Sequence, residues 1–391
     1  MAEIHRASET PSGPIVNPSK TILFAGGGTG GHLYPGISVA QALRQLLPDV
    51  TPLFLCTTRA IDKTILDPTG FQYITQPIVP PVRSVSGLLR FWKSWRETKD
   101  LVKSILKERE PVAVLGLGGY AAGVAVKVAV EKRKIPAAIL NPDVIPGKAN
   151  QFLLNHVKAV CCQFDETRGH ISGSKHERLI LTGCPIRTDI RVLRPRDEAV
   201  ARLGLDPMLQ TLVITGASQG AQTVNDAVLA SLAKIKLQGW QVLHLAGQEH
   251  VEAVRAGYRD LNLSAARVID FTDNMADIWA VADLCVSRAG ASSCAELTAC
   301  GVPSILMPYP FHKDMHQRAN AKVLEAAGAA VIVDDTKNSN TNSEKLIPIL
   351  ESLLYNANAR QEMAARARSI GKPDAAERVA KVLIDLIASD R

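Results

Sequence analysis

The stretch Thr21-Ile-Leu-Phe-Ala-Gly-Gly-Gly-Thr-Gly-Gly-His32 decides the fold of the first half of the chain. A short strand-like run leads directly into a glycine-rich turn, and a helical pattern follows in which Val39, Leu43 and Leu46 share one face. Such a loop presents backbone N–H groups and the positive end of a helix dipole to an anion, usually a phosphate. The stretch therefore predicts an α/β fold with an anion-binding turn.

The second half repeats this arrangement. Thr211-Leu-Val-Ile-Thr-Gly-Ala-Ser-Gln-Gly-Ala221 is again a strand followed by a glycine-containing turn, and Val224, Val228, Leu232 and Ile235 mark the helix after it. A cleft between two such domains is a natural place to bind a diphosphate and its partner.

Further strand-like runs alternate with helical patterns along the chain. They lie at residues 53–56, 112–115, 136–140, 179–182, 242–245, 283–287 and 304–307. Nearly continuous apolar strands separated by helices predict parallel sheets covered on both faces. The polar stretch from Ile190 to Pro207 predicts a linker. We expect a flexible leader at 1–19, a first domain at 20–190, a linker at 191–208 and a second domain at 209–372.

Length and composition agree with two globular domains. The chain has 391 residues, a net charge of +7 and 46% hydrophobic residues. No apolar run approaches the roughly 18 residues that a spanning helix needs. The seven cysteines are odd in number, lie mostly in apolar runs and form no Cys-x-x-Cys pair. They predict buried free thiols in a cytoplasmic protein.

Two known types of phosphate-binding loop can be tested against the residues of the first loop. Gly26, Gly28 and Gly31 satisfy the spacing of a dinucleotide fingerprint, which also needs an acid at the end of the second strand. That strand ends instead in Thr57-Thr-Arg59, so an NADP oxidoreductase is a weak alternative. No Lys-Ser/Thr follows the glycines, which excludes a Walker-type loop.

Six motifs taken in order are far more specific than one fingerprint. They are Gly28-Thr-Gly-Gly-His-Leu-Tyr-Pro35, Gly118-Gly-Tyr-Ala-Ala-Gly123, Gly183-Cys-Pro-Ile-Arg187, Ser218-Gln-Gly-Ala221, Arg288-Ala-Gly-Ala-Ser-Ser-Cys-Ala-Glu296 and His312-Lys-Asp-Met-His-Gln-Arg-Ala-Asn320. This series resembles the MurG-type glycosyltransferases. Their activity is transfer of N-acetylglucosamine from UDP-N-acetylglucosamine to the polyprenyl-diphosphate-linked muramoyl-pentapeptide of peptidoglycan synthesis.

The resemblance implies the GT-B fold, with two Rossmann-like parallel-sheet domains that face a central cleft. It implies that the first domain takes the acceptor on the membrane side and that the second binds the UDP-sugar donor. The amphipathic pattern from Pro373 to Ile387 predicts a final helix, at 373–391, which in the family packs back on the first domain.

The resemblance also implies the site residues. His32 would accept the proton of the attacking hydroxyl or position the acceptor, because a nearly neutral imidazole suits either role. Asp143 is a second candidate for the base. Substrate contacts are implied at Thr29, Gly30, Gly31, Asp143, Arg187, Ser218, Thr272, Ala291, Ser292, Ser293, Cys294, Ala295, Glu296, Gln317 and Asn320. For the helical residues among these, capping or a solvated helix face is the structural alternative.

One motif departs from the family. Where the family usually has Glu-Gln-Asn, this chain has Asn141-Pro142-Asp143. The change removes a carboxylate at Asn141 and adds one at Asp143. It leaves open another acceptor, another UDP-sugar enzyme such as a glycolipid transferase or a 2-epimerase, or a non-catalytic protein that binds UDP-sugar.

The segment Leu88-Leu-Arg-Phe-Trp-Lys-Ser-Trp-Arg96 interleaves aromatic and basic residues. Phe91 and Trp95 fit a buried stripe, which leaves Leu88, Leu89 and Trp92 as an apolar tip among cations. Such a tip suits an anionic membrane surface, so we expect peripheral contact with the cytoplasmic face of the membrane. No nucleic-acid module is present, and nucleic acid is not an expected partner.

The chain contains no Asp-x-Asp, the pair that holds a divalent cation in metal-dependent glycosyltransferases. We therefore expect neither a metal nor another cofactor, with helix N-termini and Arg187 stabilising the leaving UDP.

Overall fold

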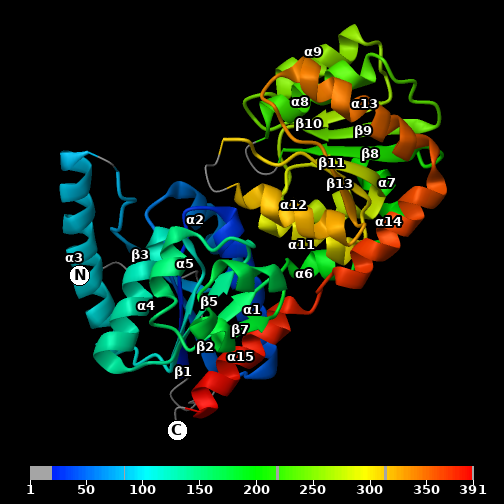
Figure 1. Cartoon of the computed structure of the whole chain (residues 1–391). Helices are drawn as coiled ribbons and strands as arrows, with labels where there is room; N and C mark the ends of the chain where they lie inside the picture. The colour runs from blue at the N-terminus through cyan, green and yellow to red at the C-terminus, as the bar shows by residue number, and fades with distance from the viewer. Residues whose placement is uncertain (1–19, 83, 217–219, 312–314, 390–391) are drawn as a thin grey trace. The chain divides into compact units, whose positions relative to one another are not determined.

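The computed structural model describes residues 20–82, 84–216, 220–311 and 315–389. The chain divides into two compact units, of which unit 1 comprises residues 1–187 and 374–391 and unit 2 comprises residues 188–373 (Figure 1). The predicted leader lies outside the described residues.

Unit 1 is built on a seven-stranded parallel sheet with the order β3-β2-β1-β4-β5-β6-β7. Its strands are β1 (Lys20–Ala25), β2 (Val50–Thr57), β3 (Gln72–Gln76), β4 (Ala113–Gly116), β5 (Ala137–Asn141), β6 (Ala159–Cys162) and β7 (Leu179–Leu181). Its helices are α1 (Gly30–Leu46), α2 (Ala60–Leu66), α3 (Val85–Glu108), α4 (Gly119–Arg133), α5 (Lys148–Leu153) and α15 (Ala375–Ser389), with short 3₁₀ turns at Asp67–Thr69, Asp165–His170 and Gly173–Arg178.

Helices cover both faces of this sheet. One hydrophobic cluster joins the strands to α1, α2 and α15, and a second joins them to α3, α4 and α5. The C-terminal helix therefore completes the core of unit 1, with Val379, Leu383 and Ile387 buried against it. Because helices cover both faces of the sheet, side chains on both sides of the central strands are buried, and these strands are apolar throughout.

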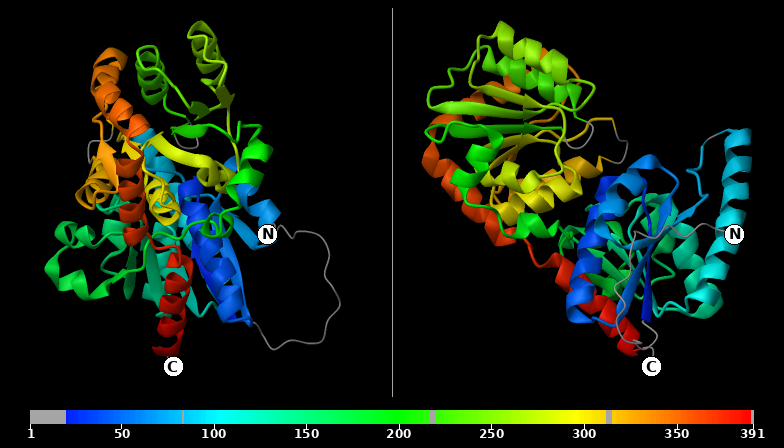
Figure 2. Two further views of the ribbon diagram at one scale, coloured as in Figure 1. Left: turned by 90° about the vertical axis from the view of Figure 1, so that its right-hand side faces the viewer. Right: turned by 180° about the vertical axis from the view of Figure 1, so that it is seen from behind.

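Unit 2 repeats the plan of a sheet covered by helices (Figure 2). Its parallel sheet has six strands in the order β10-β9-β8-β11-β12-β13. Its strands are β8 (Gln210–Thr215), β9 (Trp240–Leu245), β10 (Ala266–Ile269), β11 (Ala282–Ser287), β12 (Ser304–Leu306) and β13 (Ala330–Ile332). Its helices are α6 (Thr188–Arg191), α7 (Arg196–Leu203), α8 (Gln222–Leu232), α9 (Val251–Asp260), α10 (Met275–Val281), α11 (Ala291–Cys300), α12 (His316–Ala326), α13 (Ser339–Tyr355) and α14 (Ala357–Ile370). The prediction of two parallel α/β domains is confirmed.

The stretch predicted as a linker has a different structure. It carries α6 and α7, and its polar residues hold these helices against unit 2. Arg194 and Arg202 form ion pairs with the buried Asp277 at 2.9 and 2.8 Å, and Arg196 binds Asp283 at 2.7 Å. The polarity that predicted a linker therefore comes from ion pairs within a folded unit.

The cysteines are free, six of them buried and Cys300 half-buried, as predicted. Among the described residues, no helix is long and apolar enough to cross a membrane.

Candidate active site

In each sheet, glycine loops follow the two neighbouring strands at which the order of the strands reverses. In unit 1, β1 and β4 are neighbours and each is followed by a loop and a helix, α1 or α4. In unit 2, β8 and β11 are neighbours and lead to α8 and α11. Ligands of open parallel sheets bind at the carboxyl ends of strands beside such a switch point. The topology thus gathers the predicted loops of each unit at its binding edge.

His32 lies in the first turn of α1, and hydrogen bonds fix the orientation of its ring. Its Nδ1 is 3.2 Å from the carbonyl oxygen of Gly27 and 3.2 Å from the hydroxyl of Thr29. Because a carbonyl only accepts, Nδ1 carries the proton and donates, which leaves Nε2 as the basic nitrogen. Burial lowers the pKa of His32, while the Gly27 bond and the charges of Asp143 and Asp62 oppose that shift.

The second glycine loop packs directly against this ring. A Cβ on Gly119 would lie 2.9 Å from Cε1 of His32, and one on Gly118 would lie 3.2 Å from its Cδ2. Both residues also have positive φ, at +101° for Gly118 and +69° for Gly119. The two loops of unit 1 therefore form one structure around His32.

Two residues hold the first loop: Asp62, which the sequence did not single out, and Arg59, which it offered only as the basis of the NADP alternative. Asp62 is fully buried and accepts hydrogen bonds from the backbone N–H of Gly28 at 2.7 Å and from the N–H and hydroxyl of Thr57, both at 2.8 Å. Arg59 donates to the carbonyl oxygen of Gly28 at 2.7 Å. The sequence signal for Asp62 was an acidic residue about one turn beyond the second strand. Asp62 binds the glycine loop itself, whereas the acid of a dinucleotide site binds a ribose.

The departure at Asn141 has a structural explanation. Asn141 is 1% exposed, donates to the carbonyl oxygen of Asp143 at 2.8 Å and accepts from the side chain of Asn150 at 3.0 Å. Asn150 also donates to the carbonyl oxygen of Leu140 at 2.9 Å. The amide that replaces the expected carboxylate thus fixes the turn that carries Asp143.

A pocket of about 670 Å³ opens beside these groups within unit 1. His32, Gly118, Gly119 and Asp143 line it, and so do the aromatic residues and lysines of three helices. These are Phe91, Trp92 and Trp95 of α3, Tyr120 and Lys127 of α4, and Lys148 and Phe152 of α5. The lining of the pocket therefore combines the imidazole of His32 and the carboxylate of Asp143 with an apolar surface of aromatic rings.

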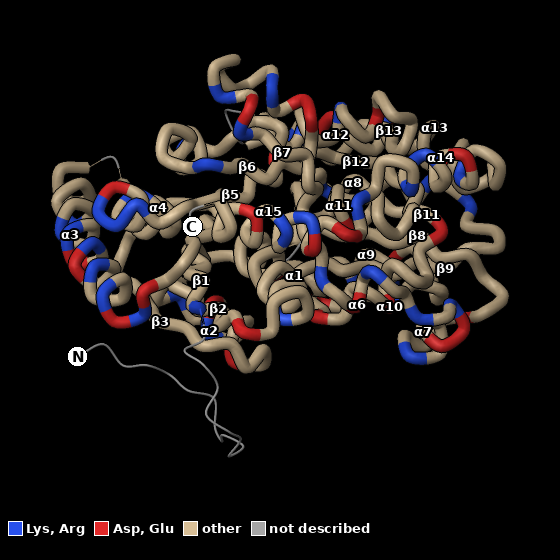
Figure 3. Tube along the Cα trace, turned by 90° about the horizontal axis from the view of Figure 1, so that it is seen from below, with Lys and Arg blue, Asp and Glu red and all other residues tan. Residues whose placement is uncertain are grey.

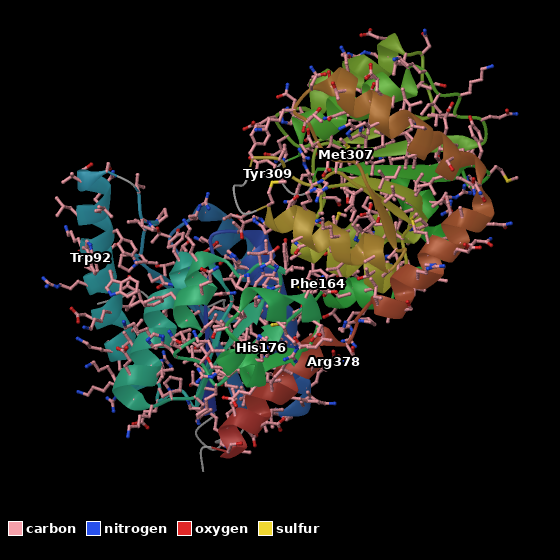
Figure 4. All side chains as sticks on the ribbon, in the orientation of Figure 1. Trp92, Phe164, His176, Met307, Tyr309 and Arg378 are labelled. Atoms are coloured by element: carbon pink, nitrogen blue, oxygen red, sulfur yellow. The ribbon has the colours of Figure 1, made fainter. Side chains whose placement is uncertain are left out.

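The start of α3 exposes the predicted apolar tip. Leu88, Leu89 and Trp92 are 47%, 66% and 63% exposed, and Figure 4 labels Trp92 on this helix. Phe91 and Trp95 pack against the core. Basic residues recur along the same helix (Figure 3). A groove beside the tip is lined by Trp92, Lys93, Trp95, Arg96, Lys99, Asp100 and Lys103. Apolar and cationic groups are thus presented together on one helix.

A buried network organises the corresponding edge of unit 2. Arg288, at the end of β11, binds Asp335 at 2.8 Å, the hydroxyl of Thr223 at 2.7 Å and the carbonyl oxygen of Met307 at 2.9 Å. Its guanidinium lies 5.6 Å from the ring of Tyr309, which follows β12 with Met307 (Figure 4). The ends of three strands and the start of α8 are therefore tied to one cation.

The predicted donor residues of unit 2 lie on α11, on α12 and in the loop before α10. Ala291, Ser292 and Ser293 form the half-exposed first turn of α11, while Cys294 and Ala295 are buried behind it. Glu296 is half-buried and accepts from the indole N–H of Trp279 at 2.8 Å. Thr272 caps its own turn by accepting from the N–H of Asn274 at 3.0 Å.

Other predicted residues have structural partners. Gln317 accepts from the N–H of Tyr309 at 2.9 Å, and the fully buried Asn320 donates to the carbonyl oxygen of Ala289 at 3.1 Å. Arg187 lies in unit 1, 4.9 Å from the ring of Tyr34 on α1. Thr29, Gly30 and Gly31 lie at the start of α1 beside His32. Ser218 lies outside the described residues.

Comparison with known proteins agrees with this arrangement. Residues 22–162 match the glycosyltransferase family 28 N-terminal domain, and residues 211–379 match the family's C-terminal domain. A Bacillus licheniformis protein is 34% identical over 93% of this chain and 98% of its own length. It is named UDP-N-acetylglucosamine–N-acetylmuramyl-(pentapeptide) pyrophosphoryl-undecaprenol N-acetylglucosamine transferase.

Solved structures give the same result. The crystal structure of Acinetobacter baumannii MurG has a TM-score of 0.74 at 26% identity and covers 94% of this chain and 99% of that one. The UDP-GlcNAc 2-epimerase from Neisseria meningitidis has a TM-score of 0.65 at 14% identity, covering 93% of this chain and 100% of that one, which shows a shared fold alone. The predicted GT-B fold class is confirmed. The chain therefore belongs to glycosyltransferase family 28 and, within it, to the MurG family of N-acetylglucosamine transferases.

Proposed function

We propose that this chain transfers N-acetylglucosamine from UDP-N-acetylglucosamine to the C4 hydroxyl of the muramoyl sugar in a polyprenyl-diphosphate-linked muramoyl peptide. The product would be the disaccharide-linked lipid of peptidoglycan synthesis, formed with inversion at the anomeric carbon. The observation that carries this proposal is the pocket of unit 1, which places His32 and Asp143 beside the aromatic rings of α3 and α5.

The pocket suits an acceptor that is part sugar and part lipid. His32 and Asp143 can contact a hydroxyl, Lys127 and Lys148 carry charge opposite to that of a diphosphate, and the rings provide apolar surface. An acceptor with a sugar, a diphosphate and a polyprenyl chain presents these three chemistries in one molecule. A small soluble acceptor would make no contact with the aromatic rings of the pocket.

The chemistry follows from the protonation of His32. The acceptor oxygen attacks the anomeric carbon and gives its proton to Nε2, while the bond to the β-phosphate oxygen breaks and UDP leaves with the electron pair. We assign Asp143 to the acceptor side, where its charge favours protonated His32. The first turn of α11 and Arg187 are our candidates to stabilise the leaving diphosphate, with Ser218, Thr272, Glu296, Gln317 and Asn320 holding the rest of the donor.

A lipid-linked acceptor requires access to a membrane. We assign the apolar tip of α3 and its flanking cations to peripheral contact with an anionic membrane surface on the cytoplasmic side. The tip and the pocket share Trp92, so a lipid-linked sugar would meet the pocket from the side at which the protein meets the bilayer.

The experiment measures UDP release from UDP-N-acetylglucosamine with and without a lipid-linked muramoyl-pentapeptide analogue. We compare the wild type with His32→Ala and with His170→Ala, which removes an exposed histidine of the same unit. We expect acceptor-dependent release that falls about 10²- to 10⁴-fold in His32→Ala and is unchanged in His170→Ala.

Each other outcome identifies an alternative. Donor binding without release on this acceptor would contradict the proposed acceptor and support a protein that binds UDP-sugar. Conversion of the donor into another UDP-sugar, without an acceptor and without net release of UDP, would favour an epimerase-like enzyme. Full activity in His32→Ala would remove His32 from proton transfer.

A further inference from the structure

The Gly27–Gly28 peptide is held from both ends. Its N–H, on Gly28, donates to Oδ1 of Asp62 at 2.7 Å, and its carbonyl, on Gly27, accepts from Nδ1 of His32 at 3.2 Å. A trans peptide is planar, with its C=O and N–H pointing in opposite directions. Any rotation that turns the N–H away from Asp62 must also turn the carbonyl away from His32.

The carboxylate is built into this position. The other oxygen of Asp62 accepts two hydrogen bonds from Thr57, at 2.8 Å each, so the side chain cannot turn without losing them. A Cβ on Gly27 would lie 2.3 Å from that oxygen, and Gly27 has φ of +157°. Only glycine at residue 27 allows the carboxylate this close approach to the loop.

We propose that Asp62 is the positioning residue of His32, acting through the Gly27–Gly28 peptide rather than by direct contact. By fixing the peptide plane it presents a carbonyl to Nδ1, which keeps the proton on Nδ1 and the lone pair on Nε2. Hydrogen bonds in series also polarise one another, so the carboxylate makes the Gly27 carbonyl a stronger acceptor. A carboxylate that orients a catalytic histidine usually binds the ring itself; here one peptide unit stands between them.

This inference rests on the proposed role of His32, but its test has a readout of its own. Nitrogen-15 NMR of the full chain labelled at histidine distinguishes protonated from unprotonated ring nitrogens, and the His32 signals are those that vanish in His32→Gln. At about pH 8, where the ring is neutral, we expect the wild type to carry the proton on Nδ1 and none on Nε2. A proton on Nε2 would overturn the proposal without any variant.

Asp62→Asn then tests the cause. The amide keeps the size of the side chain but replaces one acceptor with an N–H₂ group, which must face either Gly28 N–H or Thr57 N–H. We expect a mixture of His32 tautomers and a kcat lower by about 10- to 100-fold, with the KM for UDP-N-acetylglucosamine within about twofold of the wild type. Wild-type tautomer together with wild-type kcat would overturn the proposal.

Two further variants separate positioning from loss of charge or of folding. Asp67→Asn removes an exposed carboxylate that accepts from the hydroxyl of Tyr73 and does not touch the loop, so tautomer and kcat should stay unchanged. Thr57→Val removes one hydrogen bond to Asp62 and leaves the Gly28 bond, so the His32 tautomer should be retained even if Asp62→Asn fails to fold. If instead His32→Ala is fully active while Asp62→Asn still shifts the tautomer, the proposed catalytic role of His32 fails and the positioning role of Asp62 stands.

Discussion

The proton on His32 is governed by its immediate surroundings. Burial favours the neutral ring and lowers its pKa, while the Gly27 carbonyl and the charges of Asp143 and Asp62 favour the protonated ring. Burial has the larger effect, so the pKa lies below its usual value of about 6.5. At neutral pH the ring is therefore ready to accept a proton.

The lowered pKa of His32 predicts how the rate of the reaction depends on pH. A base works only when unprotonated, so kcat/KM should be level near neutrality and fall as the pH drops through a midpoint below about 6.5. Asp143→Asn removes a charge that raises the pKa, so its midpoint should move to lower pH. Rates of acceptor-dependent UDP release across the pH range measure both midpoints, and a wild-type midpoint above 6.5 would contradict the assignment.

At the scale of elements, α4 contains two glycines that differ in whether their position can accept a larger residue. Gly119 has positive φ and lies against His32, while Gly123 lies inside the helix, where an added Cβ would meet only the ring of Trp95 at 3.9 Å. The first glycine is required by the site, and the second is a helical residue for which alanine is normally more favourable.

Matched alanine substitutions should separate these roles. Gly119→Ala should lower kcat by at least about 100-fold because the new methyl group displaces His32, with UDP binding to unit 2 unchanged. Gly123→Ala should raise the free energy of unfolding by about 0.5–1 kcal/mol. Steady-state rates and chemical denaturation check the pair, and equal activity in the two variants would contradict the close packing of Gly119 on His32.

The tip of α3 makes a second prediction at this scale. Leu89→Ser and Trp92→Ala remove exposed apolar groups, each worth about 1.5–3 kcal/mol when fully buried. The double variant should bind vesicles that contain anionic lipid at least tenfold more weakly in a sedimentation assay. Val192→Ser, which removes an exposed apolar residue of unit 2, serves as the control and should bind like the wild type.

The elements that sequence patterns predicted and those they missed differ in burial and length. Central strands such as β1 and β8 are apolar runs beside glycine turns, and they were predicted to within one residue. β3 is flanked by glutamines, β10 is a half-exposed edge strand and β13 has three residues, so none of them has a strong pattern. β6 is an apolar run that could have been recognised.

The residues of the candidate site likewise fall into those that a local sequence pattern indicates and those that it does not. The glycine loops, His32 and Glu296 belong to contiguous motifs, so they could be proposed as site residues from the sequence. Asp62 and Asn150 were not, because their partners lie 34 and 9 residues away along the chain. Their roles depend on which side chains the fold brings together, and local patterns do not contain that information.

At the scale of the whole molecule, unit 1 is discontinuous in sequence. Its first 187 residues are completed by α15, whose apolar face covers α1 and part of the sheet. Without that helix, the sheet of unit 1 would expose an apolar face to water, which is costly for an isolated α/β layer. The stability of unit 1 therefore depends on residues at the other end of the chain.

Leu383→Ala tests this dependence. Leu383 is fully buried in α15, so its truncation should cost about 2–5 kcal/mol and loosen unit 1. Hydrogen exchange should speed up in peptides from β1 and β4 and stay unchanged in β8 and β11. Leu46→Ala, at a site 43% exposed on α1, should change exchange in neither unit.

The same discontinuity affects how the chain acquires its structure during translation. The segment that would seal unit 1 leaves the ribosome only after the whole of unit 2 has been made, about 187 residues later (374 − 187). At roughly 5–20 residues per second this is a delay of about 10 to 40 s. Throughout that interval the nascent first sheet lacks its last helix, while unit 2 is being synthesised, and all six strands of the second sheet have been made before α15 follows. The later-made half of this protein can thus reach its native state before the half that is synthesised first.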